Sequence, residues 1–252
     1  MKSVSLNDPL KYDNNECLVC KGNKNLLHLY CLSLIDTALT REKLLEQSIK
    51  TMADCKLYYF NTKGRAELIR LLYAFKDVKF EDVRFSETFK FEDFKHKTRF
   101  GSVPVLEVNG VFYAQSMAIA RYVARELGLM GSSSLQTLKV DMIVDAISVD
   151  IFPHLMNIVW GSTDEIKNAA RTKATETTKK ILPALEKMVA GDYFLGSEVT
   201  LADIIFFTFN NEALPVLELN LDEHPKLFKI SKSLKENENI KKYLTNPSTP
   251  QK

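Results

Sequence analysis

The sequence predicts a small α/β unit followed by an all-helical unit, behind an N-terminal extension. Strand and helix patterns alternate from about Lys56 to Leu127, and Gly131–Ser134 has the composition of a linker. Beyond this linker the apolar residues follow helical periodicity, without comparable strand alternation. We therefore predict an extension at 1–51, an α/β domain at 52–130 and a helical domain at 131–252.

The α/β unit is expected to begin with a strand and a helix. Leu57–Phe60 is short, apolar and aromatic, as strands often are. After a bend at Gly64, apolar residues recur at i, i+3, i+4 and i+7, which marks one face of a helix. These residues are Leu68, Leu71, Leu72 and Phe75. A second strand is predicted at Val78–Phe85, and a short irregular helix at Phe89–Lys97.

A hairpin and another helix complete this unit. Val103–Val108 and Val111–Ala114 are predicted strands joined by Asn109-Gly110, which favours a type I′ turn because both positions need positive φ. Ser116 then begins a helix. Its apolar face consists of Ile119, Tyr122, Val123 and Leu127. The resulting order, β-α-β-α-β-β-α, is the thioredoxin-like arrangement.

Composition excludes several classes of function. The 34 basic and 32 acidic residues leave a net charge of +2, which provides no electrostatic case for binding nucleic acid or an anionic membrane. No apolar run approaches the roughly 20 residues that span a bilayer. The N-terminus lacks the apolar run of a secretory signal, and Arg41 is the only arginine of the first fifty residues, unlike a transit peptide. A cytoplasmic protein is expected.

Cysteine placement limits the chemistry further. All four cysteines lie in the first 55 residues, which excludes a disulfide framework for the folded body. Cys17, Cys20, His28 and Cys31 are zinc-ligand types, but their loop is short for a zinc finger, and we expect no metal. A helical pattern at 39–49 also lies in the extension, which is not expected to join the main fold.

The same placement points to a thiol carried by a ligand. Thioredoxin-like domains usually have a reactive cysteine where the first helix begins, but Phe60–Glu67 contains none. The residue placed to act on an incoming thiol is Tyr58 or Tyr59. A phenol that donates to the sulfur favours the thiolate, and Arg65 adds a nearby cation. Lowering the thiol pKa from about 8.5 by about two units corresponds to roughly 2.7 kcal/mol, within reach of these two groups.

Several spaced motifs resemble the sigma-class glutathione transferases, which include the haematopoietic prostaglandin D synthases and the helminth and mollusc enzymes. The motifs are KLYYF-x-x-x-GRAELIR, FGSVPVLEVNG, QSMAIARYVARELGL, GSEVTLADIIFF and the ending HPKL…IKKYLTNPSTP. They occur in the family's order and cover the chain from about Lys56 to Pro250.

The resemblance implies a role for each matching residue. Tyr59, just before phenylalanine in KLYYF, is the catalytic tyrosine, and Arg65 supports the thiolate. The backbone of Val103, which precedes a cis Pro104, pairs with the cysteinyl part of glutathione. Gln115 and Ser116 hold the γ-glutamyl carboxylate. Physical chemistry supports Ser116 independently, because a helix N-terminus favours an anion.

The remaining roles match the family less well. Lys95 and Phe91 correspond to a lysine and a tryptophan at the glycyl end of glutathione, so Phe91 departs from the pattern. An acidic residue from a partner subunit commonly reaches the glutathione amine; the candidates are Asp145 and Asp150, of which we choose Asp150. A vicinal acidic pair is absent, which puts in doubt the divalent-metal effect of some members.

These observations predict conjugation of glutathione, as co-substrate, to small hydrophobic electrophiles by a homodimer without a metal. One alternative is a glutathione-dependent isomerase of the prostaglandin D synthase type. Such enzymes use a tryptophan early in the second domain, whereas here His154 follows Phe152-Pro153 and Trp160 lies farther on. Another alternative is a non-catalytic carrier or crystallin-like protein. Thr200–Asp203 is predicted to be a helix-capping box, with a hydrophobic staple from the flanking residues.

Overall fold

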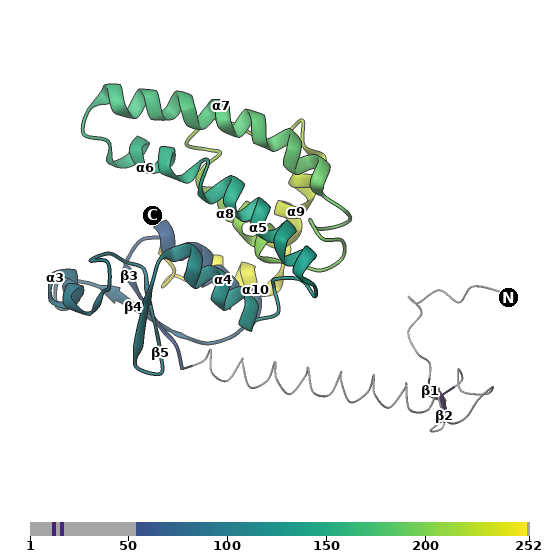
Figure 1. The fold of residues 1–252 in the computed structure, drawn as a ribbon, viewed down its shortest axis with the longest axis horizontal. Helices are drawn as coiled ribbons and strands as arrows, with labels where there is room; N and C mark the ends of the chain where they lie inside the picture. Colours follow the sequence, from purple (N-terminus) through teal and green to yellow (C-terminus); the bar gives the residue numbers. More distant parts are fainter. Residues whose placement is uncertain (1–11, 14–15, 18–53, 251–252) are drawn as a thin grey trace. The chain divides into compact units, whose positions relative to one another are not determined.

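The structure is a computed structural model and describes residues 12–13, 16–17 and 54–250 (Figure 1). The chain forms two compact units, Met1–Gln47 and Ser48–Lys252. In the first, β1 (Tyr12–Asp13) and β2 (Glu16–Cys17) pair antiparallel. The rest of the predicted extension lies outside the described residues. The helical pattern at 39–49 also lies outside the described residues. Of the four residues of zinc-ligand types, only the backbone of Cys17 is described.

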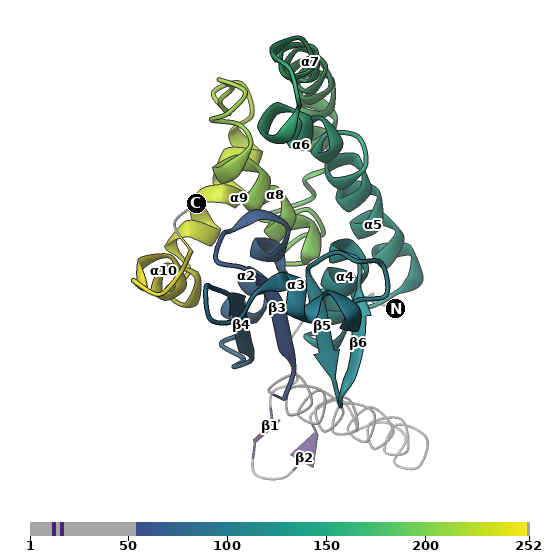
Figure 2. The same ribbon diagram turned by 90° about the vertical axis from the view of Figure 1, so that its left-hand side faces the viewer.

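A mixed four-stranded sheet forms the α/β part of the second unit, in the order β4-β3-β5-β6 (Figure 2). The central strand β3 (Lys56–Phe60) is parallel to β4 (Glu81–Phe85) and antiparallel to β5 (Val105–Val108). β5 continues through a hairpin into β6 (Val111–Ala114). Asn109 and Gly110 form the turn with φ of 52° and 78°, the positive values that a type I′ turn requires.

Helices follow the strands in the predicted order. The 3-10 turn η2 (Gly64–Ala66) leads into α2 (Glu67–Phe75), and α3 (Phe91–Phe94) continues into η3 (Lys95–Lys97). α4 (Ser116–Glu126) follows the hairpin. The predicted apolar face of α2 is buried, except that its last member, Phe75, is only partly covered. The predicted β-α-β-α-β-β-α order is confirmed.

Two strands begin later than predicted. β4 begins at Glu81 because Val78 donates its amide to the carbonyl of Tyr73, at 3.0 Å, and so ends α2. β5 does not include Val103, because the next residue, Pro104, has no N–H to donate to a strand ladder. The peptide bond between Val103 and Pro104 is cis, as the family resemblance implies.

The remainder of the unit is helical, as predicted. Its six helices are α5 (Ser134–Ser148), α6 (Phe152–Trp160), α7 (Asp164–Met188), α8 (Leu201–Glu212), α9 (Pro225–Glu236) and α10 (Glu238–Thr245). The predicted boundary at residues 130–131 stays a prediction, because a single core spans both parts.

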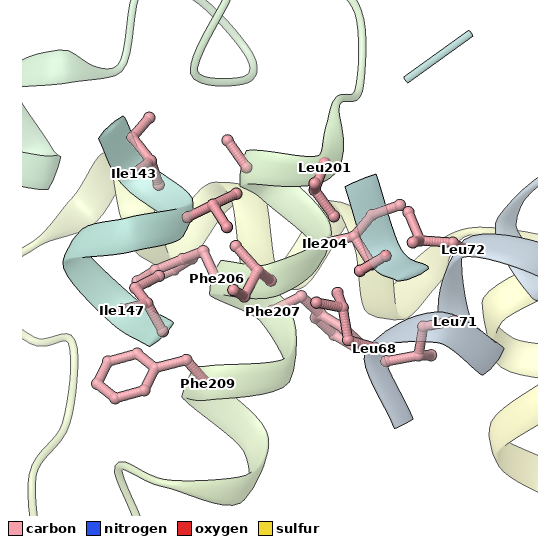
Figure 3. Packing of buried hydrophobic residues seen from close by; sticks show 14 of the residues in the cluster. Leu68, Leu71, Leu72, Ile143, Ile147, Leu201, Ile204, Phe206, Phe207 and Phe209 are labelled. Carbon is pink, nitrogen blue, oxygen red and sulfur yellow. The ribbon is translucent and has the colours of Figure 1, made fainter. Parts of the chain in front are cut away.

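That core is centred on α8, which is buried from Leu201 to Phe209. Figure 3 shows Leu68 and Leu71 of α2 on one side of α8 and Ile143 and Ile147 of α5 on the other. Each fully buried aliphatic side chain contributes about 1.5–3 kcal/mol. This packing holds the N-terminal end of α2 beside Ile205 and Thr208 of α8, which positions the site described below.

The predicted capping box is formed at the start of α8. The Asp203 carboxylate accepts the amide of Thr200 at 2.8 Å, the hydroxyl of Thr200 at 2.8 Å and the amide of Phe194 at 2.9 Å. Burial raises the pKa of Asp203 to about 6, while these three donors act in the opposite direction. Asp203 therefore joins α8 to the loop before it and serves the fold.

The stretch Ser134–Trp160 differs from the prediction that no apolar run approaches the length of a bilayer span. By length and composition alone it could cross a membrane. A single such stretch is weak evidence for a membrane, and here it consists of two helices, α5 and α6. Most of this stretch is not buried, and several of its apolar side chains are exposed, among them Leu135, Leu138 and Met142.

Candidate active site

The two neighbouring tyrosines of β3 point to opposite faces of the sheet, because side chains alternate along a strand. Tyr58 packs in a small apolar cluster and stacks on Phe94, with ring centroids 4.4 Å apart. Its hydroxyl donates to Oε2 of Glu107 at 2.6 Å. Burial, followed by this hydrogen bond, raises the pKa of Tyr58. Its proton is therefore committed within the protein.

The side chain of Tyr59 faces the main core, and its hydroxyl accepts a hydrogen bond where that of Tyr58 donates one. Its hydroxyl oxygen accepts the backbone N–H of Arg65 at 3.1 Å. Within residues 54–250 the hydroxyl proton of Tyr59 has no acceptor, so it is free to be donated to a ligand. The side chain is 9% exposed, which limits competition from water. The structure thus supplies a physical difference between Tyr58 and Tyr59 that the residue types alone do not.

Gly64 makes room for the Tyr59 hydroxyl. A Cβ at position 64 would lie 2.6 Å from Oη of Tyr59, and the backbone there has φ of +40°. No side chain fits this space unless the tyrosine moves. Glycine at this position is therefore part of the geometry that places the hydroxyl beneath the turn into α2.

We expect Gly64→Ala to slow a reaction that uses the Tyr59 hydroxyl at least tenfold, because a displacement of about 1 Å at a reacting group costs that much or more. The affinity for the thiol ligand should change less than the rate; titration measures the affinity and steady-state kinetics the rate. Gly110→Ala is the matched control, because it also has positive φ but its Cβ meets nothing within 4 Å. Equal losses in both variants would contradict the role of Gly64.

A small cavity of about 60 Å³ lies next to this turn, between the two parts of the unit. Gly64, Arg65 and Leu68 line it from the start of α2, and Ser116 and Met117 from the start of α4. The helical part contributes the remaining lining residues, which are Ser148, Phe152, Pro153, Ile205 and Thr208. The cavity therefore joins a polar rim from the sheet domain to a mostly apolar wall from the helices.

Ser116 lies at a helix N-terminus that no side chain caps. The residue before it, Gln115, has φ of 78° and makes no side-chain hydrogen bond to the first turn of α4. Ser116 is 8% exposed and lines the cavity. The free N–H groups and the helix dipole favour a carboxylate at this point.

The backbone at Val103 is also available. It lies just before β5, and neither its amide nor its carbonyl is hydrogen-bonded to any residue of the 54–250 segment. An extended peptide can pair with such an edge as an added strand. The geometry is suitable for the cysteinyl backbone of glutathione, the role that the resemblance implies.

Phe91 and Lys95 lie away from the cavity lining. Phe91 is half-buried and packs edge-on against Phe60, with centroids 5.6 Å apart, and against Phe85. Lys95 is exposed on η3. The structure therefore does not bring this pair onto Tyr59, and their glycyl-end role stays a prediction.

The acidic candidates differ in their contacts. Asp145 and Asp141 both form ion pairs with Arg121, the second at 2.7 Å. Asp150 is exposed and lines a separate open hollow of about 610 Å³ with His154 and Lys173. Within one chain Asp150 does not reach the cavity beside Arg65. Its predicted contact with glutathione across a dimer stays a prediction.

Sequence reasoning missed the buried charges beneath this site. Glu67 and Arg70, in the GRAELIR motif, are 2% and 1% exposed. A signal was present, because both lie within a helix whose apolar positions imply burial on the same side. Among residues 54–250, no group of three His, Cys, Asp or Glu side chains is arranged to hold a metal ion.

Comparison with known proteins places this geometry in a family. The family model "Glutathione S-transferase, N-terminal domain" matches residues 54–125, and "Glutathione S-transferase, C-terminal domain" matches 149–247. The hematopoietic prostaglandin D synthase of Gallus gallus is 36% identical over 70% of this chain and 87% of its own length. Glutathione S-transferase 1 of Ascaris suum is 34% identical over 79% of this chain and its own full length.

A solved structure agrees with these sequence relatives. The glutathione S-transferase of Ascaris lumbricoides superposes with a TM-score of 0.68 and 32% identity, over 79% of this chain and 98% of its own. The predicted thioredoxin-like domain followed by an all-helical domain is confirmed. The two-part fold, the tyrosine with a free proton and the sequence relatives agree: this chain is a member of the glutathione S-transferase family.

Proposed function

We propose that the protein conjugates the thiolate of glutathione to small hydrophobic electrophiles, with Tyr59 stabilising the thiolate. The observation that carries this proposal is the uncommitted proton of the Tyr59 hydroxyl, whose oxygen is already fixed by the Arg65 amide. A thiol placed at this hydroxyl would be held as thiolate by the phenol and by the Arg65 guanidinium. The apolar wall of the adjoining cavity would hold the electrophile close to the sulfur.

The glutathione itself would lie along the sheet domain. Its γ-glutamyl carboxylate would bind the start of α4, through Gln115 and Ser116, and its cysteinyl backbone would pair with Val103, before Pro104. The glycyl end would extend towards Lys95. The uncapped N-terminus of α4 and the free backbone of Val103, just before β5, support this orientation.

Calorimetric titration with glutathione, followed by a conjugation assay with a chromogenic aryl halide, tests the proposal. We expect binding with a dissociation constant between about 1 μM and 1 mM, the usual range for enzyme substrates. The conjugation rate should rise with pH as the bound thiol ionises. Absence of glutathione binding would contradict the proposal and favour the carrier or crystallin-like alternative.

Glutathione-dependent isomerisation, as in prostaglandin D synthesis, is the second candidate. It is favoured by the name of the Gallus gallus relative. Trp160, however, is 79% exposed at the end of α6 and does not line the cavity. Product analysis with an endoperoxide substrate distinguishes the two reactions, because isomerisation regenerates free glutathione and conjugation consumes it.

We also infer that the protein acts as a cytoplasmic homodimer without nucleic-acid or membrane partners. An apolar stripe on α5, consisting of Leu135, Leu138 and Met142, is more than half exposed at i, i+3 and i+7 spacing. A further apolar hollow of about 400 Å³ includes Phe100 and Tyr113, which are also exposed. Burial against a second copy accounts for both surfaces.

The charged variant Leu138→Glu is therefore expected to convert the dimer to monomer, because an interface centre does not tolerate an unpaired charge. Light scattering coupled to size exclusion measures the molar mass. Phe228→Glu on α9 is the matched control, since Phe228 is as exposed as Leu138 but lies outside the stripe. A monomeric parent protein, or an unchanged mass in Leu138→Glu, would contradict this assignment.

A further inference from the structure

A group of buried charges lies at the base of the candidate active site. Glu67 and Arg70 are one helical turn apart on α2, with the Arg70 Nη1 and Glu67 Oε2 atoms 3.6 Å apart. Nε of Arg70 donates to Oδ2 of Asp82 on β4, at 3.0 Å. Burying charges is costly unless each is paired and hydrogen-bonded. Because its burial is costly, we ask which function this group of charges serves.

The guanidinium of Arg70 is bonded to the loop that connects Tyr59 to Arg65. Its Nη1 atom donates to the carbonyls of Thr62 and Lys63, at 2.8 and 3.4 Å, and Nη2 donates to that of Phe60, at 3.5 Å. Its Cζ lies 5.9 Å from the centroid of the Tyr59 ring. Arg70 thus holds three carbonyls of the segment Phe60–Lys63 and lies over the ring of the tyrosine that this segment positions.

The C-terminal helix is linked to the same group. Tyr243 of α10 donates its hydroxyl to Oε2 of Glu67 at 3.0 Å, and α10 lies beside α2 (Figure 2). Oε2 of Glu67 therefore faces both the Tyr243 hydroxyl and the Arg70 guanidinium. A continuous set of contacts leads from the C-terminal helix to the loop before Arg65.

The electrostatics of Glu67 show why the tyrosine hydroxyl matters. Burial raises the pKa of Glu67, while Arg70 and Tyr243 lower it. Other charged groups act on it from Lys63 in the loop and Glu212 at the end of α8. Without the Tyr243 hydroxyl, Glu67 takes up a proton more readily and attracts Arg70 less strongly. The Arg70 guanidinium, which donates to the loop carbonyls, is then held less firmly by Glu67.

We propose that Tyr243 and Arg70 are positioning residues for the reaction: through Glu67 they hold the Phe60–Lys63 loop so that the Arg65 amide keeps the Tyr59 hydroxyl aligned on the glutathione sulfur. This inference rests on the proposed function, because it assigns a role in stabilising the bound thiolate. Arg70 is 1% exposed, Tyr243 is partly buried on α10, and neither side chain lines the cavity.

The test compares Tyr243→Phe with Asn239→Ala. Both residues attach α10 to α2, since Asn239 donates its Nδ2 to the Phe75 carbonyl at 3.2 Å, but only Tyr243 contacts Glu67. The ultraviolet absorbance of the bound thiolate is titrated with pH, and glutathione affinity is measured by calorimetry. Tyr243→Phe should lower the thiolate fraction and kcat at pH 6.5 about threefold, the effect of one misaligned hydrogen bond.

Glutathione affinity should stay within about twofold of the parent in both variants, and Asn239→Ala should keep the parent's thiolate titration. A parent without glutathione binding or a thiolate band would overturn the proposed function together with this inference. A parent with the band and an unchanged titration in Tyr243→Phe would overturn the positioning role alone. Equal shifts in both variants would also overturn it, because general loosening of α10 would then be the cause.

Arg70→Lys provides a second variant. Lysine keeps the charge but cannot bond Asp82 and three loop carbonyls at once. A folded Arg70→Lys protein should show a larger loss of thiolate than Tyr243→Phe, with glutathione still bound. A normal thiolate titration in folded Arg70→Lys would contradict the proposal.

Discussion

Tyr59→Phe is expected to lower kcat/KM for conjugation about 100-fold at pH 6.5, because losing about two pKa units of thiolate stabilisation corresponds to roughly 2.7 kcal/mol. The difference should narrow as the pH rises from 6.5 to about 8.5, where half of an unassisted thiol is ionised. Steady-state kinetics across this pH range and the absorbance of the bound thiolate measure both effects. Glutathione affinity should change little, because the phenol acts on the sulfur alone.

Tyr58→Phe is the matched control for this prediction. It removes a hydroxyl from the adjacent residue of the same strand, but that hydroxyl donates to Glu107 on the opposite face of the sheet. We expect a loss of about 1–2 kcal/mol in the free energy of unfolding and a normal thiolate titration. Conjugation that survives in Tyr59→Phe and disappears in Tyr58→Phe would reverse the assignment.

The second large effect is expected on stability. Asp203→Ala should lower the free energy of unfolding by about 3 kcal/mol or more, because two buried amides and a hydroxyl lose their acceptor. Urea denaturation followed by circular dichroism measures the change. At a temperature where the variant is folded, glutathione binding should be retained, since Asp203 does not line the cavity.

An exposed aspartate supplies the comparison. Asp192 forms an ion pair with Lys229 at 2.7 Å, but both side chains are more than half exposed. Its replacement by alanine should cost less than about 1 kcal/mol, because solvent screens such pairs. A similar loss in Asp192→Ala and Asp203→Ala would mean that the capping box contributes no more than a surface charge does.

The pH dependence of stability has a defined sign for the same residue. The folded pKa of Asp203, about 6, lies above the ordinary value of 3.8, so the folded state holds the proton to higher pH than the unfolded state. This contribution is therefore complete below about pH 4 and is lost as the pH rises through 6. Asp203→Asn carries no ionisable proton at this position, and its unfolding free energy should lack this slope.

Local sequence patterns predicted most of the secondary structure in residues 54–250. The i, i+3, i+4 spacing identified α2, Asn109-Gly110 identified the hairpin, and the Thr200 and Asp203 pair identified the start of α8. The predicted starts of β4 and β5 were wrong because a second local effect outweighed the strand pattern at each of them. Val78 completes the end of a helix, and Pro104 removes a donor from the strand.

The candidate site, like the fold, was predicted only in part from the sequence. The absence of cysteine after Cys55 and the position of Tyr58 and Tyr59 beside Arg65 already predicted a tyrosine acting on a ligand's thiol. Only the tertiary structure showed which hydroxyl is committed to Glu107 and which has a free proton. That difference depends on a partner 49 residues away in the chain, which no local pattern encodes.

Sequence by itself therefore determined the fold class, the family and the kind of chemistry, because these follow from short-range spacing and residue type. The tertiary structure decided the burial of Glu67 and Arg70, their link to Tyr243 and the space that Gly64 leaves for Tyr59. The physical reason is separation along the chain: Tyr243 is 176 residues from Glu67, and only the packing of α10 against α2 brings them together.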